Sequence, residues 1–162
     1  MFALELTADL TGVTNLHPVD TREDPYYYSF RVQCTSCREV HEKWVDFDRF
    51  TTTDLSKSRG EANFVYKCRN CTRESSATIK TEPKAYTAAS PPTKQVIIEF
   101  ECRGCELTEF RVSGKWGAEG ISEGASRSRF DEVDLTEDWY DYDEKTGEEV
   151  SVKEVRWVIR RA

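Results

Sequence analysis

The sequence predicts an all-β fold with little helix, because apolar and polar residues alternate in several segments. In the stretch YYYSFRVQC, the alternating apolar residues are Tyr26, Tyr28, Phe30 and Val32. This period of two is typical of a strand with one buried face. The same phase recurs before two later cysteine pairs, at Phe64 and Tyr66 and at Ile98 and Phe100. We therefore expect each of the three cysteine pairs to lie at the end of a strand.

Five further segments have strand character, whereas helix has little support. The strand candidates are residues 2–10, 40–47, 76–81, 107–112 and 150–160. Gly147 lies in a short polar segment before the last of these, so residues 139–160 are predicted to form a β-hairpin. No window shows apolar residues at sustained helical spacing, although residues 136–140 could form a single helical turn. Pro83, Pro91 and Pro92 predict a loop in the middle of the chain.

Length, composition and charge predict a globular protein that does not bind nucleic acid. The chain has 162 residues, 38% of them hydrophobic, which suffices for one domain over residues 1–162. Its formal net charge is −7, and no stripe of lysines and arginines is present that would neutralise a row of phosphates. Glu5 and Asp9 interrupt the first residues, and no apolar run has the length of a membrane span. We expect a monomer in the cytoplasm, with the nucleus as a second location, and no attachment to a membrane.

Six cysteines fall in three C-x2-C pairs, and this spacing indicates metal binding. The pairs are Cys34/Cys37, Cys68/Cys71 and Cys102/Cys105. Intracellular thiols are kept reduced, and two thiolates separated by two residues can bind one zinc ion from a tight turn. We expect Cys34, Cys37, Cys68 and Cys71 to hold one Zn²⁺ per chain in a closed, structural site. His41 is a weaker candidate, because four sulfurs already complete the site.

The spacing of the pairs also suggests an internal duplication. Cys34, Cys68 and Cys102 follow one another at intervals of 34 residues, and the segments before them are strand-like. A helical repeat of this length needs two amphipathic helices per unit, which these segments do not provide. Two pseudo-symmetric lobes are the alternative: residues 1–80 would carry the zinc site, and residues 81–162 would lack a complete one. Cys102 and Cys105 would then correspond to Cys34 and Cys37.

Six blocks spread over the chain resemble the eukaryotic CXXC-motif-containing zinc-binding protein family. They are TNLHP, QCTSCREVHEKW, GEANFVYKCRNC, FECRGCELTEF, WGAEG and DWYDYDEKTGEEV. The resemblance implies an all-β, pseudo-symmetric fold of coiled antiparallel sheets and one zinc ion held by Cys34, Cys37, Cys68 and Cys71. The family is one of uncharacterised function. Its pattern does not require Cys105, so the resemblance assigns no metal to the third pair.

The third pair, Cys102 and Cys105, has three interpretations from its chemistry. It could be a reduced, metal-free turn left over from duplication. It could hold a soft metal ion such as Cu(I), or Zn(II) transiently, and pass it to a partner. It could also be a redox pair, although reactive thiols usually lie at a helix N-terminus and four glutamates nearby would raise the thiol pKa values. The alternative function is therefore a metal-handling or thiol-redox factor that uses this pair.

The remaining patterns favour a binding protein over an enzyme. No nucleophile elbow, dinucleotide fingerprint or metalloprotease motif is present, so no residue is assigned a catalytic role. Segment 131–149 carries ten acidic residues interleaved with Trp139, Tyr140 and Tyr142. It could be a docking surface for another protein, in which aromatic side chains anchor and carboxylates steer. The alternative is a solvated hairpin whose aromatic side chains face the core.

Overall fold

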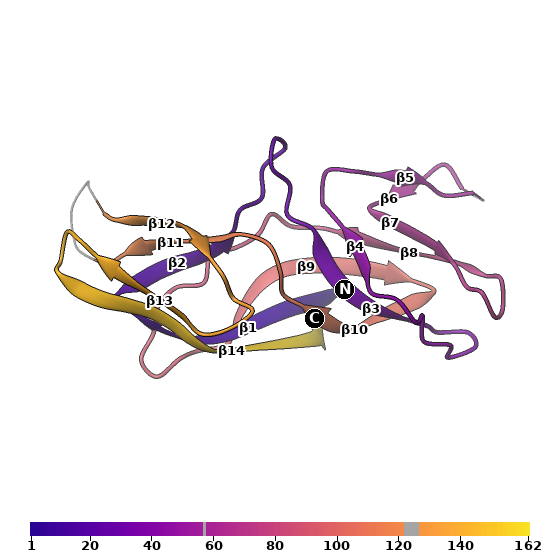
Figure 1. The fold of residues 1–162 in the computed structure, drawn as a ribbon. Helices are drawn as coiled ribbons and strands as arrows, with labels where there is room; N and C mark the ends of the chain where they lie inside the picture. Colours follow the sequence, from indigo (N-terminus) through magenta and orange to yellow (C-terminus); the bar gives the residue numbers. More distant parts are fainter. Residues whose placement is uncertain (57, 122–126) are drawn as a thin grey trace.

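A computed structural model describes residues 1–56, 58–121 and 127–162, and it confirms the all-β prediction. The described residues form strands, turns and loops, and none of them is helical. All strand pairs are antiparallel, and the molecule is elongated (Figure 1). The strands are β1 (Phe2–Thr11), β2 (Val13–Pro18), β3 (Tyr28–Cys34), β4 (Val45–Phe47), β5 (Thr53–Asp54), β6 (Glu61–Ala62), β7 (Phe64–Lys67), β8 (Glu74–Ile79), β9 (Gln95–Arg103), β10 (Cys105–Arg111), β11 (Trp116–Gly120), β12 (Arg129–Val133), β13 (Trp139–Asp143) and β14 (Glu148–Arg161).

A six-stranded sheet with the order β13-β14-β1-β9-β8-β7 connects the two ends of the molecule. Its longest pairing joins β1 to β14, from Phe2 opposite Arg161 to Thr11 opposite Ser151. Leu4 and Leu6 of β1 are fully buried, because smaller sheets cover this sheet. Strands β2, β11 and β12 lie toward one end, and β5 to β8 lie toward the other (Figure 1).

A three-stranded sheet, β10-β3-β4, packs on the large sheet through aromatic side chains. Tyr28, Phe30 and Val32 of β3 are fully buried, as the alternation of this segment predicts. The Phe30 ring lies 5.4 Å from that of Phe100 on β9 and 5.3 Å from that of Phe110 on β10. Burying an aromatic side chain of this size contributes roughly 2 to 3 kcal/mol. This contact therefore fixes the two sheets against each other.

A second three-stranded sheet, β12-β11-β2, closes the other end around Trp116. Trp116 is fully buried and donates its indole N–H to the Tyr26 hydroxyl over 3.1 Å. The Tyr26 hydroxyl in turn donates to the carbonyl of Ser113 over 2.6 Å. Both buried polar groups are thus satisfied, which avoids the cost of an unpaired donor in the core.

Two element predictions differ from the structure. Strand β4 covers only Val45–Phe47 of the predicted 40–47, and Val40 forms an isolated bridge with Gln33. Residues 136–140 form no helical turn: Thr136 donates through both its backbone N–H and its hydroxyl to Asp134, and β13 begins at Trp139. An aspartate that accepts these bonds favours a turn over a helix. The hairpin over residues 139–160 is confirmed, with Gly147 at φ 73°.

The proline-containing segment forms a loop between β8 and β9, two strands that pair with each other in the large sheet. Tyr86 anchors this loop and is fully buried. Its hydroxyl accepts the backbone N–H of Ala8 over 3.1 Å and donates to the carbonyl of Thr93 over 2.6 Å. The described part of the chain contains no helix long and apolar enough to cross a membrane.

Replacing Tyr86 by phenylalanine tests this anchor. Tyr86→Phe leaves the buried N–H of Ala8 without its acceptor, and an unsatisfied buried group costs about 1 to 3 kcal/mol. We expect the free energy of unfolding, measured with urea, to fall by this amount. Tyr142→Phe removes a hydroxyl from a side chain that is 52% exposed, and it should change stability by less than about 0.5 kcal/mol. Equal effects of the two substitutions would contradict the anchor.

Candidate zinc site

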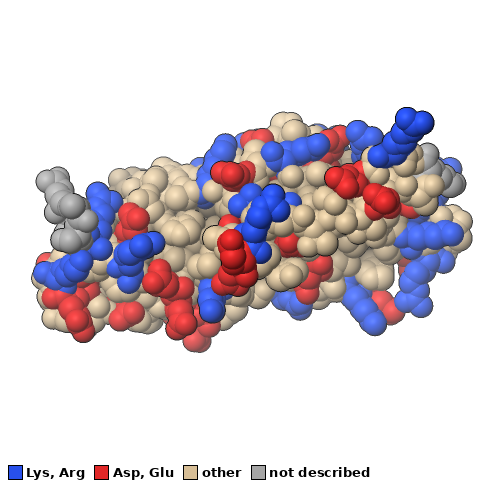
Figure 2. All heavy atoms as spheres, turned by 90° about the horizontal axis from the view of Figure 1, so that it is seen from above, with Lys and Arg blue, Asp and Glu red and all other residues tan. Residues whose placement is uncertain are grey.

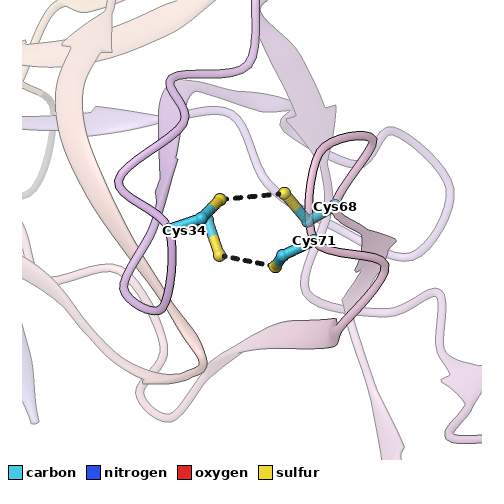
Figure 3. A group of neighbouring side chains, drawn as sticks. Cys34, Cys68 and Cys71 are labelled. Carbon is cyan, nitrogen blue, oxygen red and sulfur yellow. Dashed lines mark hydrogen bonds between the residues drawn. The ribbon is translucent and has the colours of Figure 1, made fainter.

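Two tight turns bring four cysteines together at one end of the molecule. Cys34 is the last residue of β3, and Cys37 lies in the turn after it. Cys68 follows β7 directly, and Cys71 lies in the turn before β8. The two turns approach each other from different sheets, with their sulfurs facing across the gap (Figure 3). Among the described residues, these four form the one cluster whose spacing suits a metal ion.

The two turns have the same backbone conformation. The N–H of Cys34 donates to Glu39 and that of Arg38 donates to Cys34, over 2.9 and 3.0 Å. The second turn repeats both bonds at the equivalent residues: Cys68 to Arg73, and Thr72 to Cys68, each over 2.9 Å. The fourth residue after the first cysteine has positive φ in both turns, 66° at Arg38 and 63° at Thr72. This region is unusual for a non-glycine residue, and above all for a β-branched threonine.

The spacing of the sulfur atoms fits a tetrahedral ion. The Cys34 and Cys71 sulfurs lie 3.6 Å apart, and so do the Cys37 and Cys68 sulfurs (Figure 3). All four sulfurs lie within 4.8 Å of one another. Zinc bound at about 2.3 Å to four thiolates requires sulfurs roughly 3.8 Å apart. The residues present therefore fit one zinc ion with four sulfur ligands.

The electrostatics of the cluster favour a bound cation. A backbone N–H of Cys37 lowers the pKa of the Cys34 thiol, and a backbone N–H of Cys71 does the same for Cys68. For Cys71, the Arg73 backbone N–H lowers the pKa, but desolvation and the neighbouring sulfurs outweigh it and raise the pKa to about 11. Without a metal, the cluster therefore retains a proton at Cys71. Zinc would replace that proton and offset part of the negative charge of the four thiolates.

Residues next to the cysteines also contact the cluster, and no sequence motif predicts their role. The side chain of Asn70 hydrogen-bonds the Cys37 sulfur and lowers its pKa. Desolvation, followed by the Cys68 thiolate, raises the pKa of the Tyr66 hydroxyl, which hydrogen-bonds that sulfur. His41 packs edge-on against Tyr66, with ring centroids 5.0 Å apart, and does not belong to the cysteine cluster. Asn70 could not be identified from the sequence, because many polar residues are found between the two cysteines of a C-x2-C turn.

Fold and site together define an all-β protein with one four-cysteine zinc site. The chain matches the family described as "CXXC motif containing zinc binding protein, eukaryotic" over residues 3–160. It is 45% identical to a UPF0587 protein of Schizosaccharomyces pombe, covering 99% of this chain and 98% of that protein. It is 39% identical to the human CXXC motif containing zinc binding protein, covering 94% and 93%. The chain therefore belongs to this zinc-binding family, as the sequence blocks predict.

Solved structures share the fold. The crystal structure of C1orf123 superimposes with a TM-score of 0.87 at 35% sequence identity, and 99% of each chain is covered. A hypothetical protein from Plasmodium falciparum gives a TM-score of 0.83 at 21% identity over 98% of each chain, which shows the fold alone. The predicted coiled antiparallel architecture is thus confirmed.

The third pair lies beside the zinc cysteines but outside their cluster. Cys105 is directly opposite Cys34 in the register of β10 and β3, and Cys102 is opposite Ala77 in that of β9 and β8. Cys105 is 3% exposed, whereas Cys102 is half-buried. The hydrogen bond between the two thiols raises the pKa of Cys102 and lowers that of Cys105. Among the described residues, no third cysteine, histidine, aspartate or glutamate lies close enough to bind a metal ion together with this pair.

Removing one zinc ligand should release the metal and destabilise the protein. We expect Cys68→Ser to lower bound zinc from one equivalent to none, as measured by elemental analysis after gel filtration. The melting temperature should fall, because structural zinc contributes on the order of 10 kcal/mol in zinc-finger peptides and a smaller share in a chain with its own core. Cys102→Ser is the matched control and should retain one equivalent. Tight retention of zinc by Cys68→Ser would show that the ligand set is wrong.

Zinc affinity should rise with pH. Protons compete with zinc for the four sulfurs, and the pKa of Cys71, about 11, means that this thiol is protonated at neutral pH when no metal is bound. Binding therefore releases protons, and its free energy becomes less favourable as the pH falls. A competition titration with a chromogenic chelator between about pH 6 and about pH 8 measures this dependence. An apparent affinity that is constant over this range would contradict proton displacement.

Proposed function

We propose that this chain is a non-enzymatic protein-interaction module in which zinc has a structural role and segment 131–149 contacts the partner. The observation that carries the proposal is the exposed pair Tyr140 and Tyr142 on the acidic edge strand β13. Exposed aromatic side chains surrounded by carboxylates are suited to bind a basic protein surface. The zinc site stabilises the opposite part of the fold and supplies no reactive position.

The ligand set supports a structural role for zinc. Catalytic zinc usually keeps one position for water or substrate, whereas four cysteines complete a tetrahedron. The sulfurs of Cys34, Cys37, Cys68 and Cys71 are all close enough to bind one ion together. A water molecule on the metal would have to displace one of these sulfurs. The site is therefore suited to joining two strand ends.

The surface of segment 131–149 supports the docking role. Tyr140 is 66% exposed and Tyr142 is 52% exposed, so these rings face solvent. Trp139 is half-buried and packs edge-on against Phe130, at 5.5 Å between ring centroids. The tryptophan thus packs against the protein, as expected for a hairpin whose aromatic side chains face the core. The two tyrosines face solvent, as expected for a docking surface.

Nine of the ten acidic residues in this segment are exposed. The exception is Asp143, which is 1% exposed. Its carboxylate accepts hydrogen bonds from the Ser128 hydroxyl over 2.5 Å and from the Lys145 backbone N–H over 3.0 Å, and these bonds lower its pKa. Asp143 therefore stabilises the hairpin and is not available to a partner. The remaining carboxylates are available to steer a basic surface toward the tyrosines.

The position of β13 and the distribution of charge also suit a protein partner. β13 is the end strand of the six-stranded sheet, so one of its edges has no strand beside it in the described structure. On the face shown in Figure 2, lysines and arginines are interspersed with aspartates and glutamates. Nucleic-acid binding favours a continuous basic surface. These features support a basic protein as the partner, and the monomeric state and the location in the cytoplasm and the nucleus stay predictions.

The tyrosine pair provides the test. We expect the double variant Tyr140→Ala/Tyr142→Ala to lose specific partners in affinity purification from cell extract while retaining one equivalent of zinc. Tyr27→Ala is the matched control, because Tyr27 is 55% exposed and lies outside the segment. It should retain the same partners as the unmodified protein. Loss of the same partners from both variants, or from neither, would refute this docking surface.

A further inference from the structure

A pocket of about 400 Å³ lies between the two zinc-binding turns. One wall consists of residues 39–42, which follow the first turn. The other wall consists of Tyr66, at the end of β7, and of Arg69 and Asn70 in the second turn. Ligand pockets in proteins have volumes of about 300 to 1,000 Å³, so this one has the size of a binding site. Because each wall is continuous with one pair of zinc ligands, the metal site sets the distance between the walls.

Both walls are held in place by the rest of the fold. The N–H of His41 donates to the carbonyl of Val32 over 2.9 Å, which attaches the first wall to β3. In the second wall, the Tyr66 ring stacks on that of Phe64, with centroids 6.0 Å apart. The rings of His41 and Tyr66 join the two walls edge-on, with centroids 5.0 Å apart. The pocket is therefore preformed, and a guest would lose little free energy in ordering its walls.

The charges of the pocket favour a cationic guest. Among the described residues, its charged side chains are Glu39, Glu42 and Arg69. Arg69 pairs with Glu42 over 2.7 Å, whereas the exposed carboxylate of Glu39 forms no ion pair with a described residue. Arg38 and Arg73 also belong to the turns, but neither lines the pocket. Four thiolates around one Zn²⁺ add an excess of negative charge beside it. Glu39 is therefore available to a cation.

A guanidinium group suits these side chains better than a compact ammonium ion. It is planar, stacks on aromatic rings, and presents two parallel N–H groups to a carboxylate. Tyr66 and His41 supply the rings, and Glu39 supplies the carboxylate. Val40 is 45% exposed and supplies an apolar surface for the aliphatic part of a long side chain. The pocket thus matches each part of an arginine side chain.

We propose that this pocket binds an arginine side chain on the surface of another protein, and that zinc assembles the pocket by holding its two walls together. A guest that contacts both walls binds more tightly when zinc closes the two turns. By reciprocity, the bound guest holds the zinc ion more tightly. The site is separate from segment 131–149, because β7 and β13 lie toward opposite ends of the molecule (Figure 1). It therefore does not depend on the docking surface proposed above.

Nuclear magnetic resonance on the full zinc-loaded chain tests the site, with the blocked peptide acetyl-Ala-Arg-Ala-amide as the probe. Saturable chemical-shift changes should appear in residues 39–42 and 66–70. The same peptide with citrulline, a neutral analogue of arginine, should produce none, and its lysine counterpart should bind more weakly. Shifts confined to segment 131–149, equal shifts with citrulline, or equally tight binding of lysine would overturn the proposal.

A single substitution tests the carboxylate. Glu39→Gln should weaken binding of the arginine peptide about fivefold, which is the upper range for an exposed charge pair. Glu23→Gln is the matched control, because Glu23 is also exposed and does not line the pocket, and it should leave the affinity unchanged. Both variants should retain one equivalent of zinc, which shows that the two turns are intact. Equal affinities of the two variants would contradict the role of Glu39.

Zinc exchange provides a measurement that needs no substitution. A saturating concentration of the arginine peptide should slow the transfer of zinc to a chelator, because the guest contacts both turns and these have to separate before the ion leaves. The citrulline peptide is the control and should leave the rate unchanged. An unchanged rate at a concentration that saturates the chemical-shift changes would show that the guest does not join the two walls, and it would overturn the coupling to zinc.

Discussion

The structure depends on a junction between two sheets that the four cysteines close. Cys34 and Cys37 end a strand of the three-stranded sheet, whereas Cys68 and Cys71 lie between two strands of the six-stranded sheet. A row of stacked rings leads from the core toward this junction: Phe30, Phe47, Phe64 and Tyr66, at centroid separations of 5.6, 5.5 and 6.0 Å. The hydrophobic contacts position the two turns, and the metal site fixes their ends. Zinc binding and core packing thus act on the same interface.

The sequence predicted features that depend on local pattern. The period of two in β3 correctly placed Tyr28, Phe30 and Val32 in the core, and Ile98 and Phe100 are likewise fully buried. The C-x2-C spacing led to the four residues that the fold brings together, because this spacing specifies one turn at each strand end. Two features were not foreseen. Arg38 and Thr72 have positive φ, but the sequence contains no glycine there to indicate it.

Features that depend on distant residues were harder to predict. The predicted strand 40–47 begins only at Val45, and Trp44, directly before it, lies against two guanidinium groups. Arg31 and Arg111 lie 4.9 and 4.7 Å from the Trp44 ring centroid, and Arg111 is 67 residues away in the sequence. Such cation–π contacts contribute about 0.5 to 2 kcal/mol each, and they join residues that are distant in the sequence. The sheet order, with β9 next to β1 and β10 next to β3, also follows from long-range packing.

The closed set of four sulfurs has a consequence for how fast the metal can be exchanged. An incoming chelator finds no vacant coordination position, so at least one cysteine has to leave before the ion can be transferred. Because the two turns come from different sheets, such a departure requires them to separate. The exchange rate of the ion would then be set by the opening of this interface rather than by the strength of the chelator. The rate of isotope exchange at the metal would therefore report how often the two turns separate.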